Sequence, residues 1–255
     1  MKYLILSLGL ILLLASCHKN GEPKFINEKA DEIKYVINLS ADKITSYSKY
    51  VDNKLTETST FFDHDTVAGW ITKNPQNKIT FKSTFMMGNN SLADSSIDTG
   101  FIQNGLYVAL THYKYKNDFM VYSTTYWEQS GDNPEAGESQ FSKTIENENV
   151  VSMQDIHGCI DYFNYNNDIN KIDIQDFSNG ITGKKNKNLV KHVSWENGCP
   201  CGPSCSFAYS DYQYKLDNNG YVTKMTETYT PCYSEPASDK ITRTIRTTIY
   251  EYNTK

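Results

Sequence analysis

The chain has 255 residues, of which 38% are hydrophobic and 22% charged, and its formal net charge is −5 at pH 7. A mildly acidic chain with only two arginines, Arg243 and Arg246, is a poor nucleic-acid binder, so we expect no nucleic-acid partner. Beyond the N-terminal signal, no apolar stretch approaches the length of a transmembrane helix.

The N-terminus has the pattern of an export signal that ends in a lipid anchor. Lys2 precedes an apolar stretch over residues 4–15, which is too short to span a bilayer and fits a signal peptide. The following Leu14-Ala15-Ser16-Cys17 resembles the lipobox of bacterial lipoproteins. The resemblance implies cleavage after Ser16 and acylation of Cys17, including palmitate-type chains that hold the protein at a membrane. The alternative is an ordinary signal peptide cleaved near Ala15, with Cys17 a plain thiol.

The residues after Cys17 bear on location. In enteric bacteria, an aspartate directly after the lipidated cysteine favours the inner membrane, and this chain has His18 at that position. Residues 18–23 also lack the acidic cluster that resembles a surface-export tag. We therefore expect a lipid-anchored, periplasm-facing protein of the outer membrane, with the cell surface as the alternative. Residues 1–16 are the expected signal peptide, 17–27 the anchor and tether, and 28–255 a single β domain with a candidate subdomain break near 129–140.

Alternation of apolar and polar residues, typical of half-buried strands, dominates the remaining chain. A short helix is predicted only near 27–33. Residues 116–118 and Asp217-Asn218-Asn219-Gly220 are predicted hairpin turns, the second of type I′. The predicted strands are 33–39, 66–72, 79–86, 106–115, 119–127, 160–165, 169–177, 189–195, 207–216, 221–229 and 241–252.

These strands predict an all-β fold, an antiparallel meander that curls into a sandwich or partial barrel. The segment 212–224, with Tyr-x-Tyr followed by Asp-x-x-Gly and a β-branched residue, resembles the tyrosine–aspartate repeat unit. Residues 180–190 resemble a stretch of Bacteroidetes outer-membrane lipoproteins that carry such hairpins and have no assigned activity. The resemblance covers about 160–252, implies antiparallel β-structure and transfers no catalytic residue.

Five cysteines remain after the anchor, and an oxidising envelope makes disulfides the expected state. Counting strands places Cys199, Cys201, Cys205 and Cys232 at one end of the sheet and Cys159 at the other. We therefore expect two disulfides among the first four, in one of three connectivities, and a free, buried thiol at Cys159. The alternative is a four-thiolate zinc site, which the Cys-x-Cys-x-x-x-Cys spacing fits only in part.

Other groups of polar residues could each serve a function, but each also has a plain structural explanation. His157 and Cys159 could form a nucleophilic pair, but Gly158 between them favours a turn. Asp63-His64-Asp65 is expected to be an exposed polar turn more than a metal site. The acidic residues Asp168, Asp173 and Asp176 do not follow the spacing of a calcium loop, so Asx turns account for them. We predict no metal, no cofactor and no catalytic residue.

The tyrosines suggest two uses. One strand face carries Tyr107, Tyr113 and Tyr115, and another carries Tyr212 and Tyr214. Exposed, they would form a platform for glycans or peptides, whereas packed ones would fix the strand register, which the scarcity of leucine favours. The leading hypothesis is a non-enzymatic binding or interaction module of the envelope. The alternatives are a carrier of an apolar ligand in a curved sheet and a glycan hydrolase.

Overall fold

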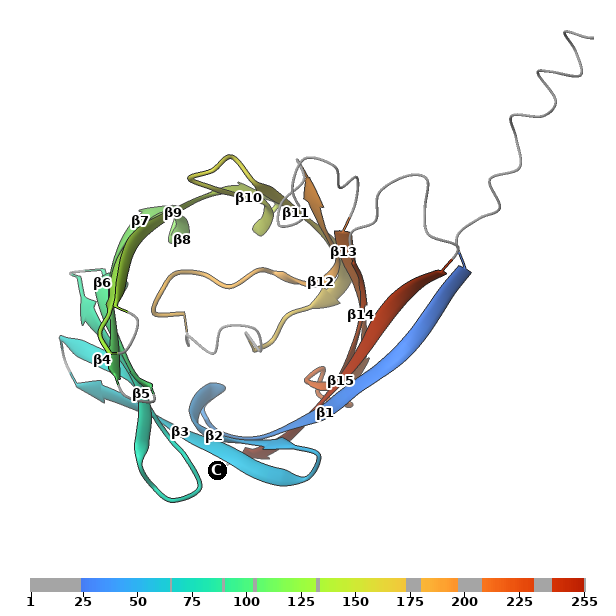
Figure 1. Ribbon diagram of the computed structural model, residues 1–255, viewed down its shortest axis with the longest axis horizontal. Helices are drawn as coiled ribbons and strands as arrows, with labels where there is room; N and C mark the ends of the chain where they lie inside the picture. The colour runs from blue at the N-terminus through green and yellow to red at the C-terminus, as the bar shows by residue number, and fades with distance from the viewer. Residues whose placement is uncertain are drawn as a thin grey trace, which may run out of the picture.

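A computed structural model describes residues 24–64, 66–88, 90–102, 105–131, 134–172, 180–196, 208–231 and 240–254. Within them, fifteen strands form one closed barrel (Figure 1). The strands are β1 (Lys24–Ser40), β2 (Lys43–Val51), β3 (Lys54–His64), β4 (Val67–Lys73), β5 (Ile79–Met87), β6 (Ala93–Ile102), β7 (Gly105–Lys116), β8 (Phe119–Gln129), β9 (Glu135–Glu146), β10 (Asn149–Asp155), β11 (Ile160–Ile169), β12 (Asn188–Glu196), β13 (Ala208–Leu216), β14 (Val222–Thr230) and β15 (Lys240–Thr254).

Each strand pairs antiparallel with its neighbours in the chain, and the barrel closes where β1 meets β15 in parallel. This seam is long, from Lys24↔Lys240 to Leu39↔Thr254, with one register shift after Lys29. The expected all-β, antiparallel meander is confirmed. The sandwich or partial barrel is wrong, because pairing of the first and last strands removes both free edges of the sheet.

Three local predictions also fail: the helix near 27–33, the end of the tether, and the turn type at Asp217. The helix near 27–33 is strand, because these residues hydrogen-bond across the seam to β15. Residues 24–27, expected in the tether, are the first four of β1. The Asp217 turn has a positive φ only at Gly220, so the two positive φ values of a type I′ turn are absent there. Residues on both sides of the candidate break near 129–140 pair within the one sheet, from Gln129↔Glu135 onward.

The cysteine prediction rested on a strand count that the structure corrects. Residues 160–169 form a single strand, β11, and the predicted strand 169–177 is not a separate crossing: its first residue ends β11 and residues 173–179 lie outside the described ranges. One strand fewer puts Cys159 at the same end as the close of β12, where Ile160 pairs with Glu196. Cys159 is disulfide-bonded, so the predicted free thiol is wrong.

The partner of Cys159 lies outside the described residues, as do all of the other cysteines: Cys17, Cys199, Cys201, Cys205 and Cys232. The disulfides proposed among the last four, and lipidation of Cys17, stay predictions.

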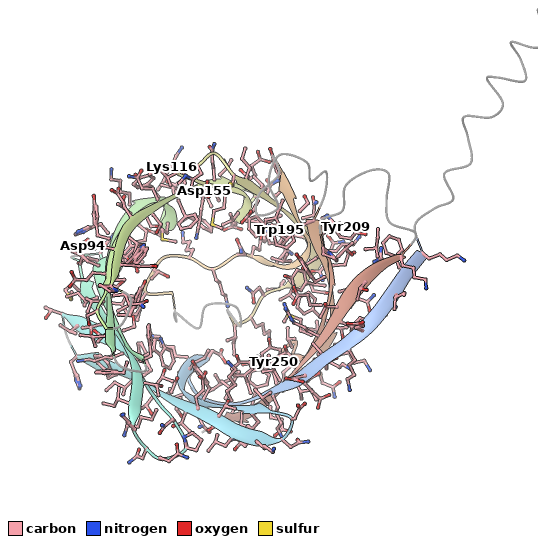
Figure 2. All side chains as sticks on the ribbon, viewed as in Figure 1. Asp94, Lys116, Asp155, Trp195, Tyr209 and Tyr250 are labelled. Atoms are coloured by element: carbon pink, nitrogen blue, oxygen red, sulfur yellow. The ribbon has the colours of Figure 1, made fainter. Side chains whose placement is uncertain are left out.

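Packing inside the barrel depends on aromatic rings. Tyr35 of β1 stacks on Tyr250 of β15 across the seam, with ring centroids 5.8 Å apart, and Tyr250 lies on the inner side of the wall in Figure 2. Trp70 contacts Tyr47 at 5.8 Å and Phe61 at 4.9 Å. Burial raises the pKa of the Tyr35 hydroxyl to about 12. Since alternate residues face opposite ways, one face of each strand points into the lumen and the other forms the outer wall.

The substitution Trp70→Ala tests this core. Trp70 is 8% exposed, so its loss should lower the free energy of unfolding by about 3–5 kcal/mol. Tyr126→Ala, at a residue that is 50% exposed, is the control and should change it by less than about 0.5 kcal/mol. Urea denaturation measures both, and equal losses would contradict the inward placement of Trp70.

Candidate binding site at the barrel mouth

The barrel has two ends, and we define them by the direction of β1. The N-terminal end is where β1 begins. The mouth is the opposite end, which carries the β1–β2, β7–β8 and β9–β10 turns and the β11–β12 connection. These three turns are two-residue hairpins in which both central residues have positive φ, a geometry that matches the twist of the strands: Ala41 and Asp42, Asn117 and Asp118, Asn147 and Glu148.

The described parts of the β11–β12 connection, residues 170–172 and 180–187, lie across the mouth (Figure 1), and we call them the mouth loop. Ile172 and Ile181 anchor it, because both are buried in the core cluster. Main-chain hydrogen bonds fix it to three hairpins. The amide of Lys184 donates to the carbonyl of Asp118 at 2.7 Å and that of Lys187 to Glu148 at 3.0 Å, while Ala93 donates to Ile181 at 2.9 Å.

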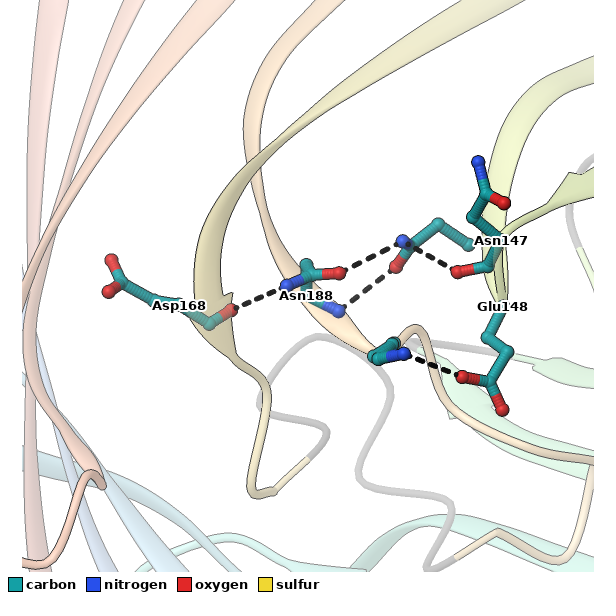
Figure 3. Close-up of polar contacts among 6 residues, drawn as sticks. Asn147, Glu148, Asp168 and Asn188 are labelled. Atoms are coloured by element: carbon teal, nitrogen blue, oxygen red, sulfur yellow. Dashed lines mark hydrogen bonds and ion pairs between the residues drawn. The ribbon is translucent and has the colours of Figure 1, made fainter.

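Side chains add a second set of attachments. Lys184 pairs with Asp118 at 3.1 Å. Lys187 pairs with Glu148 at 2.9 Å (Figure 3). Lys187 holds the pKa of the Glu148 carboxyl below its ordinary value. The larger cause is the hydrogen bond from Lys187, and the smaller is its positive charge. Both ion pairs are more than half exposed, so solvent screens them and they add little to the stability of the fold.

An amide network beside the ion pairs joins β10 to β12 (Figure 3). The Asn149 Nδ2 donates to Asn188 Oδ1 at 3.1 Å, and the Asn188 amide donates back to Asn149 Oδ1 at 2.9 Å. Asn188 Nδ2 also donates to the carbonyl of Asp168, at 3.4 Å. The loop therefore leaves and rejoins the wall at defined positions.

A cavity of about 690 Å³ lies between the mouth loop and the turns. Its apolar lining comes from Ile44, Leu92, Phe119, Ile169 and Ile172. Its charged lining has five lysines and three acids: Lys43, Lys171, Lys184, Lys185, Lys187, Asp42, Asp118 and Glu148. The surplus of positive charge, set against an apolar lining, suits a small amphipathic anion.

Asn170 gives the cavity an unused acceptor. Its side chain is 8% exposed, and Oδ1 has no hydrogen-bond partner in the structure. Because a buried polar atom without a partner costs free energy, a donor on a bound molecule could pair with it. Asn170 lies in the cavity lining, between Ile169 and Lys171.

Most residues singled out in the sequence lie away from this cavity. His157 and Cys159 belong to a turn at the N-terminal end, where both amides donate to Asp155 Oδ1 at 2.8 and 2.9 Å. The predicted turn is confirmed, and a disulfide-bonded Cys159 cannot be a nucleophile.

The acidic candidates singled out in the sequence are only partly described by the structure. His64 stacks on Phe62, and Asp65 lies outside the described residues. The Asp168 amide donates to Asn166 Oδ1 at 2.9 Å, as in an Asx turn, and Asn166 Nδ2 donates to Asp168 Oδ2 at 2.9 Å. Asp173 and Asp176 lie outside the described residues. In the part of the chain that the structure describes, no group of three His, Cys, Asp or Glu residues could hold a metal ion.

The tyrosines pack, as the scarcity of leucine suggested. Tyr107 stacks on Trp127, Tyr113 bonds Ser96 at 2.8 Å, and the Tyr115 hydroxyl donates to the carbonyl of Ala93 at 2.7 Å. Burial raises the pKa of Tyr212 to about 12 and that of Tyr214 further. The described chain contains no helix with the length and apolarity that a bilayer crossing requires.

The chain is similar in fold to solved porin-like proteins. One, from Bacteroides uniformis, is 14% identical with a TM-score of 0.51, over 80% of this chain and 84% of that one. Another, from Bacteroides vulgatus, is 13% identical with a TM-score of 0.45, over 70% and 85%. No family model matches the sequence, and a search of curated proteins also finds no match. At such low identity the first likeness shows the barrel fold alone.

Gly183 provides a test of the mouth loop. Its φ is +114°, and a Cβ there would lie 2.8 Å from the Asp118 carbonyl oxygen and 2.9 Å from the Met120 nitrogen. Gly183→Ala should therefore displace the loop, at a cost of about 3 kcal/mol, and speed amide hydrogen exchange at Lys184 and Lys187.

Gly180→Ala is the matched control, since its φ is also positive, at +79°, but a Cβ there would meet only a carbonyl oxygen at 3.7 Å. It should cost about 1–2 kcal/mol from backbone strain and leave the amides at 184 and 187 protected. Similar exchange in both variants would mean that the loop is not seated on the β7–β8 hairpin.

Proposed function

We propose that this chain is a non-enzymatic envelope protein, lipid-anchored at Cys17, that binds a small amphipathic anion at the mouth of its barrel. The observation that carries the proposal is the cavity under the mouth loop, with apolar side chains, five lysines and the unpartnered Asn170 oxygen in its lining. A cavity of about 690 Å³ has the size for a single small molecule.

The outer wall supports attachment by lipid in place of a barrel embedded in hydrocarbon. The neighbour from Bacteroides uniformis is described as porin-like, and a spanning barrel needs an apolar outer band. Here the Lys34–Glu251 pair, at 2.6 Å, alternates along the seam with the inward Tyr35 and Tyr250. On β12 and β13, His192 pairs with Asp211 at 2.8 Å. Lysines in a lipid-facing band would each cost about 2–4 kcal/mol at mid-membrane.

The two other functions considered from sequence receive less support. A carrier of an apolar ligand needs an apolar inner face, whereas the inner face here includes the Glu227–Arg246 pair, at 3.3 Å, and Asp98. Burial raises the pKa of the Asp98 carboxyl, and Ser83 opposes that shift by a hydrogen bond. A hydrolase needs a carboxyl that stays protonated as general acid, whereas Glu148 in the cavity has its pKa lowered by Lys187.

Binding can be measured with 1-anilinonaphthalene-8-sulfonate, an amphipathic anion, added to mature protein carrying Cys17→Ser. We expect saturable fluorescence enhancement. Ile169→Trp adds bulk at a cavity residue that is 63% exposed, and Lys171→Glu reverses one lysine of the lining. Each should weaken binding about tenfold or more.

Lys82→Glu is the control, because it makes the same charge reversal at an exposed residue outside the cavity lining and should leave affinity unchanged. The uncharged analogue N-phenyl-1-naphthylamine should bind more weakly than the sulfonate. Tighter binding of the uncharged probe would favour the apolar carrier, and equal effects of Lys171→Glu and Lys82→Glu would refute the mouth site.

The lipid anchor has its own test in the native host. Cys17→Ser should abolish incorporation of radiolabelled palmitate and move the protein from the membrane to the soluble periplasmic fraction. Ser16→Ala keeps a small residue before the cysteine, so it should retain both label and membrane association. Persistence of the label in Cys17→Ser would show that acylation, if any, occurs elsewhere.

A further inference from the structure

Large apolar side chains are exposed around the N-terminal end of the barrel. We call six of them the apolar rim: Phe25, Leu55, Ile79, Phe101, Leu106 and Ile156. Each lies within the first or last two residues of a strand, or in a turn, at the end where β1 begins. Phe101 is 48% exposed and Ile156 is 50% exposed. They come from six elements spread around the barrel, so the rim is a property of this end and not of one hairpin.

The outer wall extends the rim along one side. In β6 and β7, Phe101 pairs with Leu106. Two positions further along the same faces, beyond Thr99 and Val108, Ile97 pairs with Leu110, and Leu110 with Tyr126 of β8. Phe101, Leu106, Ile97, Leu110 and Tyr126 are each at least 36% exposed, so the stripe extends the rim along the wall and is open to the surroundings. An exposed apolar surface of this kind marks an interaction site.

The mouth differs in character. Its turns present Asp42, Asp118 and Glu148, and the loop across it presents a run of lysines. The large apolar side chains exposed at its strand ends, within the described residues, are Ile169 and Leu216. The two ends are therefore chemically unequal, with one apolar and the other charged.

The length of chain before β1 limits what can cover the rim. Six residues lie between Cys17 and Lys24, and the seven residue steps that join them span about 25 Å at most when the chain is extended. An acylated Cys17 would hold the N-terminal end within that distance of the bilayer surface, while the mouth would face away. The surface that the tether brings nearest to the rim is thus the membrane itself.

We propose that the N-terminal end docks on the membrane that holds the lipid anchor, with the apolar rim and the β6–β8 stripe in the interfacial layer of the bilayer. The orientation rests on the anchor at Cys17 given under the proposed function, but the affinity of the rim for lipid does not. Charges at this end are mixed, because Lys54 and Lys78 lie at the same end of the barrel as Asp52 and Glu128, so apolar burial drives the contact and lipid charge contributes little.

Flotation with vesicles of phosphatidylethanolamine and phosphatidylglycerol tests the rim without the anchor. Mature protein carrying Cys17→Ser should bind weakly but measurably. Leu106→Ser should lower the partition coefficient about tenfold, and Phe101→Ser with Leu106→Ser should bring it to background.

Leu216→Ser is the matched control. Leu216 is 38% exposed, against 37% for Leu106, and lies at the mouth, so this variant should float like the parent. Equal thermal midpoints would show that all of the variants fold. A parent that does not float, or equal losses in Leu106→Ser and Leu216→Ser, would overturn the proposal.

Two further outcomes separate this proposal from its alternatives. A dimer in sedimentation that Leu106→Ser dissociates, with no flotation, would assign the rim to a second copy and overturn membrane docking. In the second outcome, Cys17→Ser shows no defect in acylation in the host, but the protein still floats with vesicles. Docking of the rim would then stand, and the anchor at Cys17 would be removed from the proposed function.

Discussion

The parallel pairing of β1 with β15 is the constraint on which the rest of the structure depends. Each hairpin reverses the chain, so an odd number of strands makes the first and the last point the same way. Closure then requires a parallel ladder, here backed by the Tyr35–Tyr250 stack. Without that ladder, two long strands would present unpaired amides and carbonyls.

Closure of the barrel also determines which side chains gather at each of its two ends. Turns alternate between the ends along the chain, so residues far apart in sequence share one rim. Asp42, Asp118 and Glu148 meet the lysines of the mouth loop in this way. The same alternation collects Phe25, Phe101 and Ile156 at the other end. The two proposed contacts, a ligand at the mouth and lipid at the rim, can therefore be occupied together.

The sequence predicted the structure best where the signals are local. Alternation located β7 and β8 to within two residues, and the polar turn at 117–118 joins them as expected. Prediction from sequence failed where the structure of a segment depends on partners far away in the chain. Nothing near 27–33 indicates that its hydrogen bonds go to residues about 215 positions later, which is why a helix was predicted there.

The candidate site was beyond local prediction for the same reason. The lysines of 184–187 read as a polar loop until the barrel brings Asp118 and Glu148 beside them. A single miscounted strand reversed the predicted end for Cys159, because every crossing of a meander exchanges top and bottom. Gly183, where a Cβ would meet the Asp118 carbonyl oxygen at 2.8 Å, shows this closely packed backbone only once the structure is known.

The seam has a consequence for how the molecule is made. Its two strands come from the beginning and the end of the described chain, so the last contact needed for closure cannot form until β15 has been synthesised. Until then the growing sheet has two open edges, each a template for pairing with another chain. Contacts of such long sequence separation also form slowly. The biogenesis of this barrel is thus exposed to aggregation for longer than that of a hairpin repeat of equal length, and a holding chaperone would have most to protect at β1, the first edge to emerge and the last to be covered.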